Sequence, residues 1–290
     1  MRISVLGGDD RSIKLANLLQ KDSHNIKLFG FDKLENNLFE ISENLDSAIE
    51  KSDIVIGPLP CSNDNILLNT PLYSKEIKME EIFSNMNKDQ IFIGGKISKE
   101  ISDMAKNYNI DTIDLLKREE MAVLNAIPTA EGAIQVAMEE TETTIHGANI
   151  MILGFGRIGK ILAKMLQGIG ANVYIEARSY SDLAGIQSYG YNPIHLREIE
   201  FYLQEMDLIF NTIPSMILDE EMLLKLKREC LVVDLASIPG GVDFETAKEL
   251  GINTIWALGL PGKAAPMTAA KIMKDTIYNI IEELGGTVCY

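Results

Sequence analysis

The chain has 290 residues, more than the usual ~100–150 of one compact domain, and 46% of them are hydrophobic, which is enough for packed cores. Acidic residues outnumber basic ones 42 to 27, and the formal charge of −15 disfavours general binding to nucleic acids or anionic membranes. Three scattered cysteines (Cys61, Cys230 and Cys289) and the lack of a run of ~18 apolar residues argue against a disulfide framework, a zinc site and a membrane helix, so we expect a cytoplasmic protein without metal.

The N-terminal segment predicts a strand, a turn and a helix. Residues 3–7 (ISVLG) are a short apolar run that ends in glycine, and residues 13–19 (IKLANLL) have helical apolar spacing. The turn between them reads GGDDR, with Asp9 where the corresponding turn of the second half has Gly156. A carboxylate at this position would face a pyrophosphate, so we expect the first half to hold substrate instead of a dinucleotide.

Polar side chains of the first half follow the ends of its predicted strands. Asp9 and Arg11 follow the first strand, Ser62 follows a second and Lys96 a third. Ligands of open α/β sheets bind at the carboxyl ends of the strands, so we expect these groups at a cleft between two domains. Helix capping by Asp9 and Ser62, and simple solvation of Lys96, are the alternatives.

The chain repeats itself, and the order of the matches predicts two similar halves. Each match is a buried strand with its flanking turn or helix. The matching pairs are 3–7 with 150–154, 52–60 with 206–214, and 105–113 with 247–255. Continuous apolar strands that alternate with helical segments indicate parallel sheets covered on both faces. We therefore expect an α/β protein with two Rossmann-like, doubly wound parallel-sheet domains.

Two helical segments set the predicted domain limits. Residues 121–140 have helical apolar spacing and predict a long helix that joins the two halves. Residues 261–284 begin with PGKAAP and predict a terminal helix, which we expect to pack on the first domain. The predicted domains are a substrate domain over 1–120, joined by the helix at 264–290, and a connecting helix with an NADP-binding domain over 121–263.

The second half contains a GxGxxG sequence between a predicted strand and a predicted helix. That context makes a glycine-rich turn diagnostic of a dinucleotide site, although a turn without ligand is the alternative. Gly154 permits the tight turn, Gly156 lets the pyrophosphate approach, and Gly159 permits close packing of helix and strand. We expect the nicotinamide ribose at the end of a later strand. The cofactor-binding residues predicted in these two places are Gly154, Phe155, Gly156, Arg157, Ile158, Gly159, Thr212 and Pro214.

The tip of the next strand indicates which dinucleotide binds. An acidic residue there would hydrogen-bond the ribose 2′-OH of NAD, but Ala177 occupies that position and Arg178 and Ser179 follow it. An arginine and a hydroxyl suit a 2′-phosphate, so we expect NADP. Glu176 should point to the opposite face of the sheet, but a register shift of one residue would favour NAD instead. For Arg178, a solvated surface charge is the alternative.

Together these motifs resemble the dipicolinate synthase A-subunit family over almost the whole chain. The resemblance is carried by residues 125–135 (NAIPTAEGAIQ), the GFGRIG turn with its ARS tip, residues 257–266 (ALGLPGKAAP) and the opening GGDDR. It implies oxidation of dihydrodipicolinate, or of hydrated 4-hydroxy-tetrahydrodipicolinate from the lysine pathway, to dipicolinate with NADP. It also implies that the partner is the flavoprotein-like B-subunit of dipicolinate synthase, and that the protein works in the mother-cell cytoplasm of a sporulating bacterium.

The architecture is more distantly similar to the D-2-hydroxyacid dehydrogenases. Those enzymes carry a catalytic histidine after a proline, whereas this chain has Pro261-Gly262-Lys263 at the comparable place. The three histidines, His24, His146 and His195, fall in predicted turns or strand entries, where structural or surface roles are the expectation. A mechanism built on histidine is therefore disfavoured.

Oxidation of a dicarboxylate ring requires cationic partners and groups that move protons. We expect Arg11, Lys96 and Lys263 to bind the carboxylates, with Lys263 also an acid or base if it is buried. Glu131 and Asp9 are the other candidates for proton transfer. Their alternative is a structural role, because a helix glutamate and a turn aspartate commonly pair or cap.

Two other functions stay open at this point. One is a dinucleotide-sensing regulatory subunit that has no turnover of its own. The other is a different NAD(P)-dependent oxidoreductase, of the alanine dehydrogenase or hydroxyacid type. The oligomeric state is also open, with a homo-oligomer as one alternative.

Overall fold

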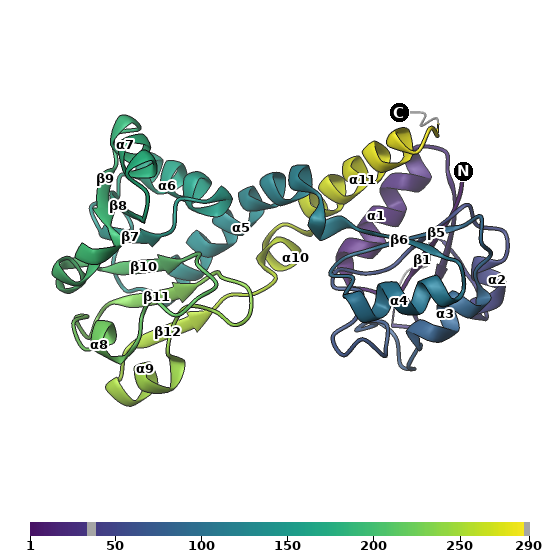
Figure 1. Ribbon diagram of the computed structural model, residues 1–290, viewed down its shortest axis with the longest axis horizontal. Coiled ribbons are helices and arrows are strands. Elements are labelled where there is room, and N and C mark those ends of the chain that lie inside the picture. Colours follow the sequence, from purple (N-terminus) through teal and green to yellow (C-terminus); the bar gives the residue numbers. More distant parts are fainter. Residues whose placement is uncertain (34–38, 287–290) are drawn as a thin grey trace. The chain divides into compact units, whose positions relative to one another are not determined.

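The structure is a computed structural model, and it describes residues 1–33 and 39–286. The chain divides into two compact units (Figure 1). Unit 1 consists of Met1–Leu124 and Pro266–Tyr290, and unit 2 of Asn125–Ala265. Each unit contains one six-stranded sheet.

Unit 1 is a doubly wound parallel sheet. Its strands run in the order β3-β2-β1-β4-β5-β6, and every pair is parallel. The strands are β1 (Arg2–Leu6), β2 (Asn25–Phe29), β3 (Glu40–Ile41), β4 (Ile54–Ile56), β5 (Ile91–Gly94) and β6 (Asp111–Asp114). The helices are α1 (Asp10–Lys21), α2 (Leu45–Ile49), α3 (Met79–Asn85), α4 (Lys99–Asn107) and the short η1 (Leu115–Lys117).

Both faces of the unit 1 sheet are buried, as parallel sheets require. Ile3 and Val5 of β1 belong to a core shared with α1 and the terminal helix, whereas Val55 of β4 belongs to a second core with α2, α3 and α4. Successive side chains of a strand point to opposite faces, so the continuous apolar runs fill two cores at once.

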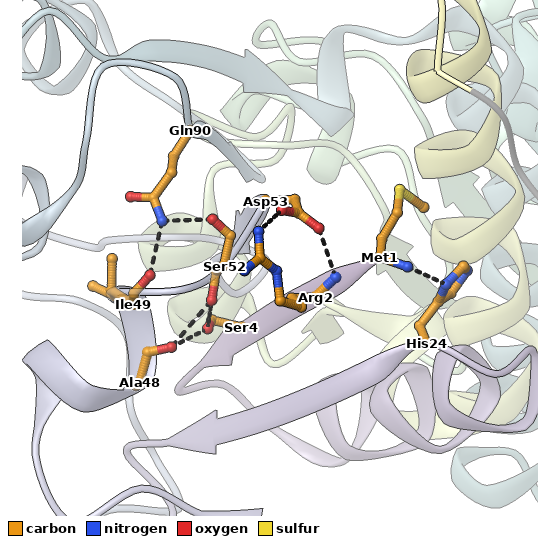
Figure 2. Close-up of polar contacts among 9 residues, drawn as sticks. All are labelled: Met1, Arg2, Ser4, His24, Ala48, Ile49, Ser52, Asp53 and Gln90. Carbon is orange, nitrogen blue, oxygen red and sulfur yellow. Dashed lines mark hydrogen bonds and ion pairs between the residues drawn. The ribbon is translucent and has the colours of Figure 1, made fainter.

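The amino edge of the unit 1 sheet is closed by buried polar contacts (Figure 2). The Ser4 hydroxyl donates to the Ala48 carbonyl at 2.5 Å and also contacts the Ser52 hydroxyl. The Gln90 amide donates to the Ile49 and Ser52 carbonyls at 2.7 and 2.6 Å. These bonds satisfy three buried polar side chains and tie α2 to β1 and to the start of β5.

The C-terminal part forms two helices, so the prediction of a single helix over 261–284 is wrong. Helix α10 (Leu260–Ala264) ends before Ala265, and α11 (Pro266–Glu283) starts after it. Ala265 has φ −141° and ψ 62°, because a residue before proline avoids the helical region. Residues 287–290 of the predicted helix at 264–290, with Cys289, lie outside the described residues.

Helix α11 packs on α1 of unit 1. Its residues Ile277 and Tyr278 are buried in the same core as Leu15 and Leu19 of α1. At its far end, Arg118 donates to both carboxylate oxygens of Glu283, at 2.8 and 2.6 Å. The last helix of the chain thus completes the core of the first unit.

Unit 2 repeats the same plan. Its strand order, β12-β11-β10-β7-β8-β9, is that of unit 1 when it is numbered from β7, and all pairs are parallel. The strands are β7 (Asn149–Leu153), β8 (Asn172–Ala177), β9 (Asn192–His195), β10 (Leu208–Asn211), β11 (Leu231–Asp234) and β12 (Asn253–Trp256). The helices are α6 (Arg157–Ile169), α7 (Tyr180–Ser188), α8 (Glu220–Leu223), α9 (Phe244–Leu250), α10, and the short η2 (Leu196–Phe201) and η3 (Leu203–Glu205).

The predicted fold class of two doubly wound, Rossmann-like parallel sheets is confirmed. The predicted long helix at 121–140 is observed as α5 (Glu119–Glu140), which runs from unit 1 into unit 2. Within 1–33 and 39–286, no helix is long and apolar enough to cross a membrane. The same residues contain no cluster of metal-ligating side chains.

Candidate functional site

A pocket of about 530 Å³ opens at the carboxyl ends of β7, β8 and β10 in unit 2. Pockets at this edge of a doubly wound sheet are the usual ligand sites of the fold. The lining residues are Gly154, Phe155, Gly156, Glu176, Ala177, Arg178, Ser179, Asp182, Thr212, Ile213 and Pro214. Seven of these residues are among those that the sequence predicted for the cofactor.

The three glycines of the turn after β7 differ in what requires a glycine at each position. Gly154 has φ +100°, a conformation that favours glycine. A Cβ on Gly159 would lie 2.1 Å from the Gly154 carbonyl oxygen, so only glycine lets α6 start this close to β7. Gly156 has an ordinary φ of −82°, and a Cβ there would meet nothing within 4 Å. Neither the backbone nor packing explains Gly156, and the space beside it is open where the sequence predicts the diphosphate.

The start of helix α6 supplies the electrostatics of an anion site. Gly156 is the N-cap residue and provides no side-chain cap. The N–H groups of a first helical turn and the helix dipole both favour a negative group at that end. Arg157 is exposed at the first helical position, and Ile158 packs partly against the core of unit 2. Arg157, Ile158 and Gly159 form this turn but do not line the pocket.

The adenosine end of the predicted site contains one cation and two carboxylates. Arg178 is exposed and lines the pocket. The Ser179 hydroxyl accepts from the Asp182 N–H at 3.0 Å and donates to the Asp182 carboxylate at 2.7 Å, so Ser179 caps α7. Sequence reasoning missed Asp182 as a pocket residue. The Ser-x-x-Asp spacing of this cap was the signal that could have found it.

Glu176 lies on the sheet face opposite α6. Ile175 and Ala177 are buried in the core that α6 covers, while Tyr174 packs against the core on the other face. Glu176 is 1% exposed, and neither of its carboxylate oxygens has a hydrogen-bond partner among the residues that the structure describes. Burial raises the pKa of this carboxyl, while the charge of Arg178 and the nearby Gly154 N–H oppose that rise.

The far end of the pocket is fixed by hydrogen bonds among the strand ends. The Thr212 hydroxyl donates to the Leu153 carbonyl at 2.8 Å, which ties β10 to β7. The Asn211 amide donates to the buried Asp234 carboxylate at 2.8 Å. This packing holds Thr212 and Pro214 at the pocket wall, beside the glycine turn.

In unit 1 the corresponding turn is already filled by its own side chains. The Asp9 carboxylate accepts from the Arg11 N–H at 2.9 Å and caps α1. The Arg11 guanidinium donates to Asp9 at 2.7 Å and to the Leu59 carbonyl at 2.5 Å, and its side chain is only 14% exposed. Both predicted functions, proton transfer by Asp9 and substrate binding by Arg11, must therefore compete with this ion pair.

The other two candidates of unit 1 lie in turns after β4 and β5. Ser62 is buried, and its hydroxyl donates to Asp64 at 3.0 Å and accepts from the Asn65 N–H at 2.9 Å, as in a structural turn. Lys96 is exposed and has φ +57°, with its N–H bonded to Asp114 at 2.9 Å. The lysine ammonium thus projects from a turn whose backbone is fixed.

Lys263 and Glu131 lie on two helices of unit 2 that pack together. A Cβ on Gly132 of α5 would lie 3.0 Å from the Cβ of Ala264 on α10, so the two helices are in close contact beside both candidates. Lys263 and Glu131 are exposed. The burial on which an acid or base role of Lys263 depended is absent.

All three histidines have structural surroundings. His24 is buried, and its Nε2 bonds the Tyr278 hydroxyl of α11 at 3.0 Å. His195 caps η2, where its Nδ1 accepts from the Arg197 N–H at 3.2 Å. His146 lies in a turn against Gly170.

Comparisons with known proteins match both units. A model of the N-terminal domain of the dipicolinate synthase A-subunit matches residues 2–116. A model of the D-isomer specific 2-hydroxyacid dehydrogenase NAD binding domain matches residues 128–237. The shikimate dehydrogenase (NADP(+)) of Pyrococcus abyssi is 28% identical over 147 residues, which cover 50% of this chain and 54% of that enzyme.

Two further relatives cover nearly the whole chain. The crystal structure of the dipicolinate synthase A-subunit from Bacillus halodurans has a TM-score of 0.89 and 31% identity, covering 97% of both chains. The dipicolinate synthase A-subunit of Bacillus subtilis is 33% identical over 287 residues, which cover 98% of this chain and 97% of the relative. The chain therefore belongs to the dipicolinate synthase A-subunit family, and it carries an NAD-binding domain of the dehydrogenase type in its second unit.

Proposed function

We propose that this protein is the dehydrogenase subunit of a dipicolinate synthase. It oxidises dihydrodipicolinate, or its hydrated form 4-hydroxy-tetrahydrodipicolinate, to dipicolinate. The observation that carries the proposal is the gap at Gly156, which lies before an uncapped helix start and is explained by neither backbone conformation nor packing. We place the diphosphate in that gap, and the family supplies the substrate class.

For the coenzyme we propose NADP, with NAD as the alternative. The support is Arg178, a pocket-lining guanidinium at the strand tip where a 2′-phosphate of the adenosine ribose would lie. Ala177, at the position of the usual acidic residue, leaves no carboxylate on that face of β8. The relative from Pyrococcus abyssi, which carries NADP(+) in its name, agrees with this choice.

In the proposed reaction the protein orients the substrate ring and moves protons. The bound dinucleotide would accept the hydride that leaves the ring, and a second ring hydrogen leaves as a proton, with water if the substrate is hydrated. We assign Lys96 and Lys263 to the two substrate carboxylates, because both ammonium groups are exposed. Arg11 and Ser62 complete the proposed substrate contacts, with Arg11 acting from its ion pair with Asp9.

We propose Glu131 and Asp9 for proton transfer, and we leave Lys263 as a carboxylate partner because it lacks the burial that an acid or base role requires. Lys263 and Glu131 are accessible on adjacent helices, whereas Asp9 is paired with Arg11. We propose that the flavoprotein-like B-subunit of dipicolinate synthase works together with this protein in the mother-cell cytoplasm of a sporulating bacterium. This part of the proposal rests on the family alone.

Absorbance at 340 nm tests the function directly. Purified protein with NADP and freshly generated dihydrodipicolinate, with and without the B-subunit, should form NADPH in at least one of the two mixtures. Coenzyme binding without turnover in either mixture would contradict the enzyme and favour a dinucleotide-sensing role. Turnover of alanine or 2-hydroxy acids alone would favour a different dehydrogenase.

A pair of lysine variants tests the site. Lys263→Gln should raise KM for the dicarboxylate by about 10-fold or more, because it removes a charged partner of one carboxylate. Lys271→Gln, at an exposed lysine on α11, should leave KM unchanged. An unchanged KM in K263Q would remove Lys263 from the proposed substrate contacts.

A further inference from the structure

Glu176 is the most unusual polar residue of the coenzyme pocket. It is 1% exposed, lies in the pocket wall between Gly154 and Arg178, and makes no hydrogen bond through either carboxylate oxygen within the described residues. An ionised carboxylate that is buried without a partner is costly, so this environment favours the uncharged acid. The ribose recognition that we propose takes place on the face of β8 that carries Ala177, so it does not use the Glu176 side chain.

The charge that acts on Glu176 is that of Arg178. Leu153 of β7 and Ile194 of β9 pair with Glu176 in the sheet and bring no charge. The guanidinium of Arg178 favours its ionised form, and so does the Gly154 N–H. The other titratable groups on the same face or on the elements packed around it are Tyr174, Tyr180 and Asp182 on α7, His195 on β9, Arg197, Glu198 and Glu200 on η2, and Tyr202. Helix α6 covers the opposite face of the sheet.

We propose that Glu176 is a specificity-determining residue that makes the choice between NADP and NAD depend on pH. Uncharged, Glu176 leaves the full charge of Arg178 to the 2′-phosphate of NADP. Ionised, it offsets part of the Arg178 charge and opposes that phosphate, while NAD, which has no such phosphate, is unaffected. The inference rests on the proposed use of this pocket by a dinucleotide and on Arg178 as the phosphate partner.

The size and sign of the effect follow from electrostatics. A unit charge that lies several ångströms from a phosphate in a partly buried site changes its binding by about tenfold. The 2′-phosphate gains its own second charge near pH ~6, which strengthens its binding as the pH rises. Ionisation of Glu176 acts in the opposite direction. Only the comparison of matched variants separates the two effects.

Calorimetric titration with NADP and with NAD between pH 5.5 and 8.5 provides that comparison. Relative to Glu176→Gln, the wild type should lose about tenfold in its NADP-to-NAD preference across this range. Asp182→Asn, at an exposed carboxylate of the same pocket, should raise NADP affinity by a similar factor at every pH. Identical pH profiles of the preference in wild type and E176Q would overturn the inference.

Proton uptake gives a second readout that needs no folded variant. At pH ~8 the 2′-phosphate already carries its second charge and releases almost no proton on binding. Titrations there, in two buffers of different ionisation enthalpy, should show that the wild type takes up protons when NADP binds and fewer when NAD binds, because the phosphate returns Glu176 to its uncharged form. E176Q, if it melts like the wild type, should lack that difference. Equal proton uptake for the two coenzymes would contradict the proposal. Failure of the wild type to bind either coenzyme at any pH would instead refute the proposed function, and this inference with it.

Discussion

The two units share a strand order but differ at one helix start. Both sheets follow the same parallel plan, and in both a glycine turn joins the first strand to the first helix. In unit 1 that helix is capped by Asp9, which is neutralised by Arg11. In unit 2 the cap is Gly156, which has no side chain to offer. The same fold is thus closed to an anion in one unit and open to it in the other.

The strand order of the fold does not by itself make a dinucleotide site. The N–H groups of a first helical turn need hydrogen-bond acceptors and favour negative ones, and the chain can supply such an acceptor itself or leave it to a ligand. Asp9 does the first, and its ion pair with Arg11 keeps the carboxylate in place. Gly156 leaves open space, so a ligand phosphate becomes the natural cap.

The largest expected effect comes from giving unit 2 the residue of unit 1. Gly156→Asp places a carboxylate where the diphosphate would lie, so NADP affinity should fall by about 100-fold or more. Binding is measured by calorimetry or by NADPH fluorescence. Gly168→Ala is the matched control, because a Cβ there also meets nothing within 4 Å and lies on the same helix. Unchanged affinity in G156D would mean that the dinucleotide lies elsewhere.

A smaller effect is expected at the other end of the pocket. Arg178→Ala removes the only cation that lines the pocket among the described residues, so NADP should bind about 10- to 100-fold more weakly, with NAD nearly unaffected. Competition between the two coenzymes in one titration measures the ratio. Equal losses for NADP and NAD would argue for a structural role of Arg178 and against 2′-phosphate recognition.

The unit 1 turn should respond in stability and not in coenzyme binding. Asp9→Ala removes the cap of α1 and the partner of Arg11, which should lower the free energy of unfolding by about 1–2 kcal/mol. Urea denaturation measures the loss, and NADP titration should give the wild-type affinity. A large loss of NADP affinity in D9A would show that unit 1 takes part in coenzyme binding and would break the comparison.

The smallest expected effect is a pH dependence of folding in unit 1. The Met1 ammonium reaches His24 Nδ1 at 3.4 Å (Figure 2). The ring Nε2 bonds the Tyr278 hydroxyl at 3.0 Å, so the neutral imidazole fits this site. Burial and the Met1 ammonium hold the pKa of His24 below its usual value. The unfolded chain therefore binds this proton first, and the free energy of unfolding should fall as pH drops below ~6.5.

Between pH 6 and 5.5 the free energy of unfolding should fall by no more than about 1 kcal/mol. Urea denaturation at several pH values measures this change. His24→Gln keeps a polar side chain but cannot titrate, so its stability should change less with pH over this window. A wild type and an H24Q variant with parallel stability profiles would exclude His24 as the cause.

Local patterns explain why much of the fold was predictable. The apolar runs at 149–153 and 172–177 coincide with β7 and β8, because buried parallel strands leave little choice of sequence. The glycine turn was predictable as well, because the backbone conformation at Gly154 and the close packing at Gly159 both require glycine. The break between α10 and α11 at Ala265 was not predicted, because Pro261 alone accounted for the start of one helix and the second proline, Pro266, was read as part of it.

Contacts between distant residues were not predictable. Nothing in the GGDDR turn shows that Arg11 would reach the Leu59 carbonyl, 48 residues away, and so be held beside Asp9. The orphaned carboxylate of Glu176 also depends on how β7 and β9 pair beside β8. The roles of Lys96, Lys263 and Glu131 stay predictions, because exposed side chains gain their function only from a bound substrate.

The placement of the coenzyme in unit 2 can be checked by a crystal structure of the protein with bound NADP. We expect density for the diphosphate at Gly154–Gly159, against the start of α6, with the 2′-phosphate beside Arg178. We also expect the GGDDR turn of unit 1 to stay closed by the Asp9–Arg11 pair. A diphosphate bound at the turn of unit 1, or no coenzyme beside Gly156 at saturating NADP, would show that the dinucleotide site is not the one proposed.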